Sequence, residues 1–170
     1  TLWVQPKIHQ IKLQLLYGLP LLLAGFGGMI NETIDRVLLK NILAPKIGLQ
    51  EAMFQLGIYG ANYKIAVLVA LFLQAFRYAA EPFFFAKSKE KNAPQLYAKV
   101  MDYLVTVLVF VFLIVILFLD VFKYFIPNAE YWQGLKVVPV LMLAKIFLGI
   151  YYSQSIWYKL SGRTIYGAII

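Results

Sequence analysis

The chain has 170 residues, of which 62% are hydrophobic and only 14% are charged. A soluble domain is rarely so apolar, so the composition indicates a membrane protein. There is no cysteine and a single histidine, His9, which excludes disulfides, thiolate metal sites and a histidine metal cluster. The formal charge of +8 is typical of loop anchors that orient membrane helices, and we expect no nucleic-acid partner, no metal and no cofactor.

Four long apolar stretches and the start of a fifth predict an all-α fold, a polytopic bundle of transmembrane helices. One uncharged run, YLVTVLVFVFLIVILFL, covers residues 103–119. At ~1.5 Å per residue it crosses most of a ~30 Å hydrocarbon core, and a helix satisfies its backbone N–H and C=O groups internally. The expected spans are residues 13–39, 56–76, 100–119 and 137–158, the second closing at Pro82, with a fifth beginning near Ile165.

The ends of the chain predict a longer parent protein, because the sequence starts without methionine and stops just inside an apolar stretch. Residues 1–12 are then the end of a cytoplasmic linker, and residues 13–170 form the transmembrane bundle. Of the basic loop residues, nine fall on the side of the N-terminus and five on the other: Lys7, Lys12, Arg77, Lys87, Lys89, Lys91, Lys99, Lys159 and Arg163 against Arg36, Lys40, Lys46, Lys123 and Lys136. By the positive-inside rule the chain enters its first span from the cytoplasm.

Polar side chains in and just after the second span recur every three or four residues, and with Ala66 and Ala70 they share one helix face: Tyr59, Tyr63, Gln74, Arg77 and Glu81. Contact with acyl chains would be costly for them, so we expect this face to contact protein or a water-filled cavity. It is either a cavity wall for a polar or anionic substrate, or an ordinary helix interface with Arg77 and Glu81 paired at the membrane surface.

Two lysines fall inside expected spans, Lys64 in the second and Lys145 in the fourth. A lysine can carry its ammonium to an interface along its methylene stem. The alternative is that each lines a cavity as a cation that balances an anionic substrate.

A polar cluster gathers at the outer end of the first span, formed by Asn31, Glu32, Asp35 and Arg36. Glu32 and Arg36 are one helical turn apart, which is the spacing of a surface salt bridge. The cluster is either such a salt-bridge cap or a site for a proton or a sodium ion.

Four segments carry a resemblance to a known family. They are LPLLLAGFGGMINETIDRVLLK at residues 19–40, LGIYGANYKIAVLV at 56–69, QAFRYAAEPFFF at 74–85 and GIYYSQSIWYKLSGRTIYGA at 149–168. Together they resemble oligosaccharide-lipid flippases, namely the polysaccharide-export (Wzx-type) branch of the multidrug, oligosaccharide-lipid and polysaccharide exporter superfamily, in a form typical of Bacteroidetes bacteria.

The resemblance implies a MATE-like transporter of two six-helix lobes around a central cavity, with this chain forming most of the C-terminal lobe. Such a protein is not an enzyme. It lies in the inner membrane and moves an undecaprenyl-pyrophosphate-linked oligosaccharide from the cytoplasmic to the periplasmic leaflet by alternating access, for surface polysaccharide or lipopolysaccharide synthesis. The implied partners are this lipid-linked substrate, membrane lipids and the N-terminal lobe. A cationic cavity is typical of the family, which favours Arg77, Lys64 and Lys145 as substrate-binding residues, with Gln74, Tyr59 and Tyr63 beside them.

Three other classes of protein stay open. A drug/cation antiporter of the same superfamily should hold acids in its cavity, whereas the charges inside the spans here are basic. A membrane-embedded enzyme of glycan assembly would need a large external loop with catalytic side chains, and no connection is long enough. A non-transporting membrane scaffold would use its polar stripes only for helix packing.

Overall fold

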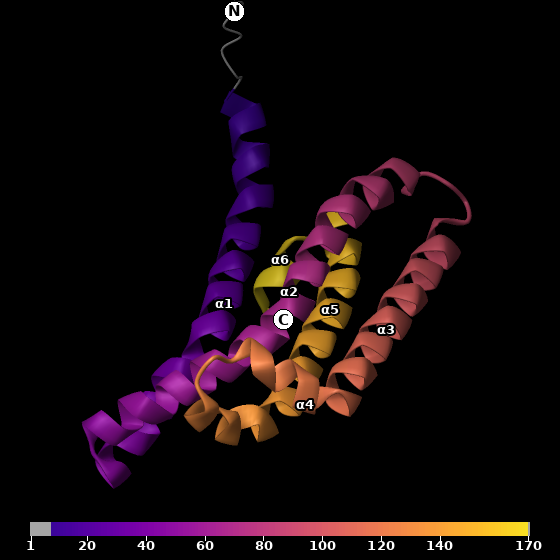
Figure 1. Ribbon diagram of the computed structural model, residues 1–170. Coiled ribbons are helices and arrows are strands. Elements are labelled where there is room, and N and C mark those ends of the chain that lie inside the picture. The colour runs from indigo at the N-terminus through magenta and orange to yellow at the C-terminus, as the bar shows by residue number, and fades with distance from the viewer. Residues whose placement is uncertain (1–7, 170) are drawn as a thin grey trace, which may run out of the picture. The chain divides into compact units, whose positions relative to one another are not determined.

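The computed structural model describes residues 8–169, and every regular element in this range is a helix. The elements are α1 (Ile8–Ile47), α2 (Leu49–Lys87), α3 (Ala93–Leu117), α4 (Leu119–Phe122), the 3₁₀ helices η1 (Lys123–Phe125) and η2 (Ala129–Val137), α5 (Val138–Leu160) and α6 (Ile165–Ile169) (Figure 1). Four stretches of the described chain are long and apolar enough to cross a membrane: Gln10–Ile47, Leu49–Lys87, Ala93–Leu117 and Ala129–Leu160. The prediction of an all-α fold is confirmed, and the four apolar stretches indicate a multi-pass membrane protein.

The described chain forms two compact units. The smaller unit holds residues up to 35 together with residues from 155 onward, and in it the Tyr17 hydroxyl donates a hydrogen bond to the Lys159 carbonyl at 3.3 Å. The Trp157 and Tyr166 rings of this unit lie 5.7 Å apart between centroids. The larger unit, residues 36–154, carries the end of α1, all of α2, α3, α4, η1 and η2, and most of α5.

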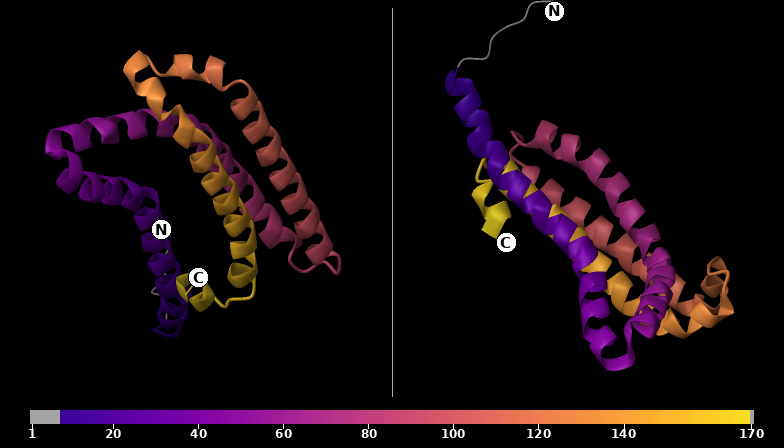
Figure 2. Two further views of the ribbon diagram at one scale, coloured as in Figure 1. Left: turned by 90° about the horizontal axis from the view of Figure 1, so that it is seen from below. Right: turned by 90° about the vertical axis from the view of Figure 1, so that its left-hand side faces the viewer.

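The core of the larger unit lies where α2, α3 and α5 run side by side (Figure 2). Its buried side chains are mostly branched or aliphatic: Ile65, Ala66, Val69, Leu73, Leu104, Leu108, Val115, Ile126, Val138, Met142 and Ile146. Gly149 of α5 lets the three helices approach one another, because a Cβ placed on it would lie 2.7 Å from Leu73 Cδ2 and 3.0 Å from Leu108 Cδ1. Small residues permit this close packing between helices in lipid, where no hydrophobic force draws apolar surfaces together.

The helices run beyond the expected spans, and α3 begins at Ala93 rather than near Val100. α1 and α2 are separated by the single residue Gly48, whose φ of 86° is accessible to glycine without strain, so the helices extend far beyond the expected ends at Leu39 and Leu56. α2 also continues through Pro82 to Lys87 rather than closing there. Proline removes one helical N–H, a loss that membrane helices tolerate when neighbouring groups and local adjustments compensate for it.

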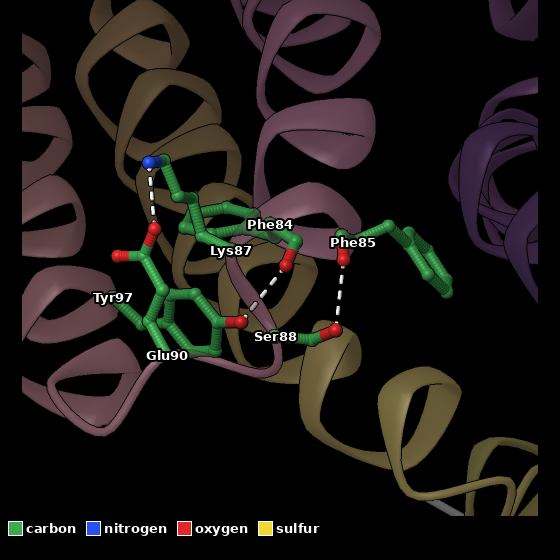
Figure 3. A network of polar contacts seen from close by, with 6 residues as sticks. All are labelled: Phe84, Phe85, Lys87, Ser88, Glu90 and Tyr97. Carbon is green, nitrogen blue, oxygen red and sulfur yellow. Dashed lines mark hydrogen bonds and ion pairs between the residues drawn. The ribbon is translucent and has the colours of Figure 1, made fainter.

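The turn between α2 and α3 is fixed by side chains (Figure 3). The Tyr97 hydroxyl of α3 donates a hydrogen bond of 2.8 Å to the Phe84 carbonyl in the last turn of α2, and the two rings meet edge to face at 4.8 Å between centroids. Lys87 Nζ and Glu90 Oε1 form an ion pair of 2.7 Å across the same turn. A terminal carbonyl that the helix itself leaves unpaired thus receives a donor from the next helix.

The connection after α3 is helical rather than an open loop. η2 packs against α2, and its first turn is capped by Asn128, whose side-chain oxygen accepts a hydrogen bond from the Glu130 N–H at 3.0 Å. The Trp132 indole N–H donates to the Ile126 carbonyl at 3.1 Å. The larger unit is therefore closed at this end by a folded segment.

Candidate functional site

A tyrosine ring on α2 receives two cations from two other helices. The Tyr63 side chain is only 5% exposed. The Arg36 guanidinium of α1 lies 4.6 Å from its ring centroid, and the Lys145 ammonium of α5 lies 5.1 Å from the same centroid. Both distances are within the ~6 Å range in which a cation is attracted by an aromatic face. We call Arg36, Tyr63 and Lys145 the Tyr63 cluster.

Lys145 faces the interior because of its register on α5. It shares one helix face with Met142, Ile146 and Gly149, which are spaced by three or four residues and are all buried. Its own side chain is 6% exposed. Lys145 is therefore buried among core residues, whereas Lys64 is exposed on α2, and a role for either lysine as a cavity cation stays a prediction.

A second cation lies over a ring between the same two helices. The Arg77 guanidinium of α2 is 4.2 Å from the ring centroid of Tyr152 on α5, and both residues are half-buried. Arg77 follows Tyr63 by roughly four turns on the same helix face. The two sites thus pair α2 and α5 in opposite senses, one with its tyrosine on α2 and the other with its tyrosine on α5.

The other predicted residues of the α2 stripe lie around these two sites. The half-buried Tyr59 ring lies 6.0 Å from that of Tyr63, centroid to centroid. The exposed Gln74 donates a hydrogen bond of 3.0 Å from its side-chain amide to the Tyr78 hydroxyl. Glu81 is half-buried, so the stripe is a mixed face of rings, an amide and charges rather than a uniformly buried seam.

The polar cluster on α1 is divided between the two units. Asn31 is exposed and Glu32 and Asp35 are half-buried in the smaller unit, whereas Arg36 belongs to the larger unit and lies over Tyr63. The ion pair between Glu32 and Arg36 stays a prediction. Among the described residues no group of three or more His, Asp or Glu side chains is placed to hold a metal ion.

Asn62, the residue before Tyr63, is a functional-site neighbour that the sequence analysis missed. It is fully buried, and its side-chain amide donates two hydrogen bonds of 2.8 Å, to the Ile58 carbonyl one turn earlier and to the Tyr131 carbonyl of η2. Its side-chain oxygen has no hydrogen-bond partner among the described residues. Gly134 of η2 packs directly on this amide, with no room for a Cβ.

The signal for Asn62 was present in the sequence. An amide within an apolar helix must satisfy its donors inside the protein, because lipid offers no partner. Glycines precede it at 57 and 60, and a donation back to the carbonyl one turn earlier tends to bend a helix. α2 is indeed bent in the view of Figure 2.

A surface hollow of about 660 Å³ lies at the turn between α1 and α2, lined by residues 47–51 and Phe54. None of the cations or rings described above lines it. Its position around Gly48 separates it from the Tyr63 cluster, so we do not assign it to the candidate site.

Comparisons of the chain with models of protein families, with curated proteins and with solved structures find no match.

Proposed function

We propose that the chain is part of an inner-membrane transporter of the two-lobe, MATE-like kind that flips an undecaprenyl-pyrophosphate-linked oligosaccharide to the periplasmic leaflet. Two lines of reasoning support the proposal. One is the resemblance of residues 19–40, 56–69, 74–85 and 149–168 to Wzx-type flippases. The other, which carries the proposal, is the Tyr63 cluster, in which two cations meet on one buried ring inside candidate membrane spans.

Cations held on aromatic rings suit a transported anion for an energetic reason. A cation–π contact contributes about 0.5–2 kcal/mol, whereas a charge-assisted bond from a cation to a phosphate oxygen contributes about 1.5–3 kcal/mol. A pyrophosphate that reached the cluster would therefore draw Lys145 and Arg36 from the ring, and the ring would receive them again after release. Such an exchange gives binding that is reversible, as transport requires.

Arg77 and Tyr152 extend the proposed path along α2 and α5. Their contact is again a cation over a tyrosine ring. A diphosphate or its sugars could therefore move between two similar binding sites as the lobes rock about the site. Tyrosine rings also offer flat apolar faces on which sugar rings can stack. Charges of this sign disfavour a cationic drug as the substrate.

The test is a flipping assay with the full-length protein in vesicles that carry the polyprenyl-pyrophosphate oligosaccharide in one leaflet. Lys145→Met keeps the length of the side chain and removes its charge, and we expect it to lower the flipping rate by about 10- to 100-fold, the equivalent of one charge-assisted bond. Lys64→Met is the matched control and should transport normally, because Lys64 is exposed. Lys145→Arg should keep part of the activity.

The opposite pattern would refute the proposal. If the wild-type protein transported organic cations and did not flip the pyrophosphate lipid, it would be a drug/cation antiporter. Equal flipping rates for Lys145→Met and Lys64→Met would remove the Tyr63 cluster from the transport path and return Lys145 to a packing role.

A further inference from the structure

The short helices that follow α3 form a distinct segment, residues 118–125. α3 ends at Leu117, and Phe118 leaves the helical conformation with φ −107° and ψ 26°. α4 and η1 follow at once and cross the end of the bundle rather than continuing along α3 (Figure 1). At ~1.5 Å per residue the 25 residues of α3 measure roughly 37 Å, slightly more than a ~30 Å hydrocarbon core, so the segment begins near the membrane interface.

One face of this segment is apolar and exposed. Phe118, Val121 and Phe125 follow at spacings of three and four residues, and their exposed fractions run from 56% to 71%. Tyr124 beside them is 71% exposed. Phe122 stacks on Phe125, with the ring centroids 5.9 Å apart, and packs against the core of the larger unit.

The charged side chains of the segment lie on the opposite face. Asp120 and Lys123 form an ion pair of 3.1 Å, and the Asp120 side chain is 94% exposed. The Lys123 ammonium also lies 5.2 Å from the Trp132 ring centroid and 5.6 Å from that of Tyr124. The two charges cancel, so the segment as a whole is neutral.

The apolar face continues a surface of α3 that a bilayer would cover. Phe110, Leu113 and Leu117 are exposed along α3, which has the highest mean hydropathy of the four candidate spans. Leu117 adjoins Phe118 directly, so no polar residue separates the two surfaces. This continuity identifies what covers the segment.

We propose that residues 118–125 form an interfacial segment that lies in the plane of the bilayer surface. Phe118, Val121 and Phe125 insert among the upper acyl chains, whereas Asp120 and Lys123 stay at the level of the headgroups and water. An amphipathic helix of this kind binds through its apolar face and through attraction to lipid charge. Because this segment is neutral, it binds zwitterionic and anionic bilayers alike, and it does so whether or not the chain transports a lipid-linked sugar.

Site-directed spin labelling tests the proposal, since the chain has no cysteine of its own. Single cysteines replace Val121 and Phe125 on the apolar face and Asp120 on the charged face, with Leu113→Cys as the lipid-exposed control on α3. The full chain is reconstituted in phosphatidylcholine vesicles, and the collision rates of each nitroxide with oxygen and with a water-soluble nickel complex are compared. Far-UV circular dichroism checks that each labelled protein keeps its helical content.

We expect the labels at 121 and 125 to collide mainly with oxygen, as the label at 113 does, and the label at 120 to collide mainly with the nickel complex. Adding anionic lipid should leave these ratios unchanged. If the labels at 121 and 125 collide with the nickel complex as often as the label at 120 does, the segment lies in water. Labels shielded from both reagents would show that protein covers this face, and either result would overturn the proposal.

Discussion

Gly149 of α5 packs against Leu73 of α2 and Leu108 of α3, and a single methyl group there should weaken the fold. In Gly149→Ala the new Cβ would lie 2.7 Å from Leu73 Cδ2 and 3.0 Å from Leu108 Cδ1, closer than the ~3.5–4.0 Å at which carbon atoms attract. Relieving such overpacking costs about 1–3 kcal/mol. Alanine also stabilises the helix by about 0.5–1 kcal/mol relative to glycine through its better helix propensity. We therefore expect a net decrease of about 1 kcal/mol in the free energy of unfolding.

The measurement is reversible unfolding of the protein in mixed micelles by increasing the fraction of denaturing detergent. Gly60→Ala on α2 is the matched control, since a Cβ there meets no atom within 4 Å, and it should be neutral or slightly stabilising. Leu73→Ala alone should cost about 2–5 kcal/mol. Combined with Gly149→Ala it should cost less than the sum of the two, by about 0.5–2 kcal/mol, because the truncated Leu73 makes room for the methyl group.

Two results would refute this reasoning. If the Gly149→Ala variant were as stable as the Gly60→Ala variant, α5 would not be in contact with α2 at this position. Strict additivity of Gly149→Ala and Leu73→Ala would show that the two residues do not touch, whatever the individual losses are.

Substitutions at two further residues, Asn62 and Tyr97, test the polar contacts that hold α2, all by the same unfolding titration. Asn62→Asp should lower the free energy of unfolding by about 3 kcal/mol or more, because a carboxylate would face the carbonyls of Ile58 and Tyr131 to which the amide now donates. Asn62→Ala should lower it by less. Equal losses in stability for the two variants would contradict this arrangement. Tyr97→Phe keeps the ring and removes only the donor to the Phe84 carbonyl, so a loss of about 0.5–1.5 kcal/mol is expected, and an unchanged stability would show that this bond contributes nothing.

The helices were predictable from the sequence because membrane spans depend on one property, the length of an apolar run. Their ends were not. Pro82 is a common helix terminator, yet α2 continues through it to Lys87. Tyr97 of α3 donates to the Phe84 carbonyl in the last turn of α2, a contact between two helices that the apolar pattern of one helix does not reveal. Gly48 is a similar case, since this one residue of positive φ connects two helices where the expected spans left residues 40–55 between them.

The candidate site was predictable where helical period decides the outcome. Helical spacing places Tyr63 and Arg77 on one face of α2. The Tyr63 ring contacts the Arg36 guanidinium of α1, and the Arg77 guanidinium contacts the Tyr152 ring of α5. Spacing could not separate Lys145 from Lys64, because each sits in an apolar helix and only the packing of neighbours decides which one is buried. Arg36 was expected in a polar cluster with neighbours on its own helix, and its contact with Tyr63 comes from the fold of the hairpin between α1 and α2.

Asn62 and Tyr63 are neighbours in sequence but hold α2 by different means. Successive helical residues point ~100° apart, so Asn62 donates to η2 while Tyr63 accepts cations from α1 and α5. The hydrogen bonds of Asn62 and the packing of Gly134 demand strict geometry, whereas a cation can shift over a ring at little cost. Charges can therefore leave Tyr63 for an anion while α2 stays in place, and that is the property the proposed transport cycle needs from this turn of the helix.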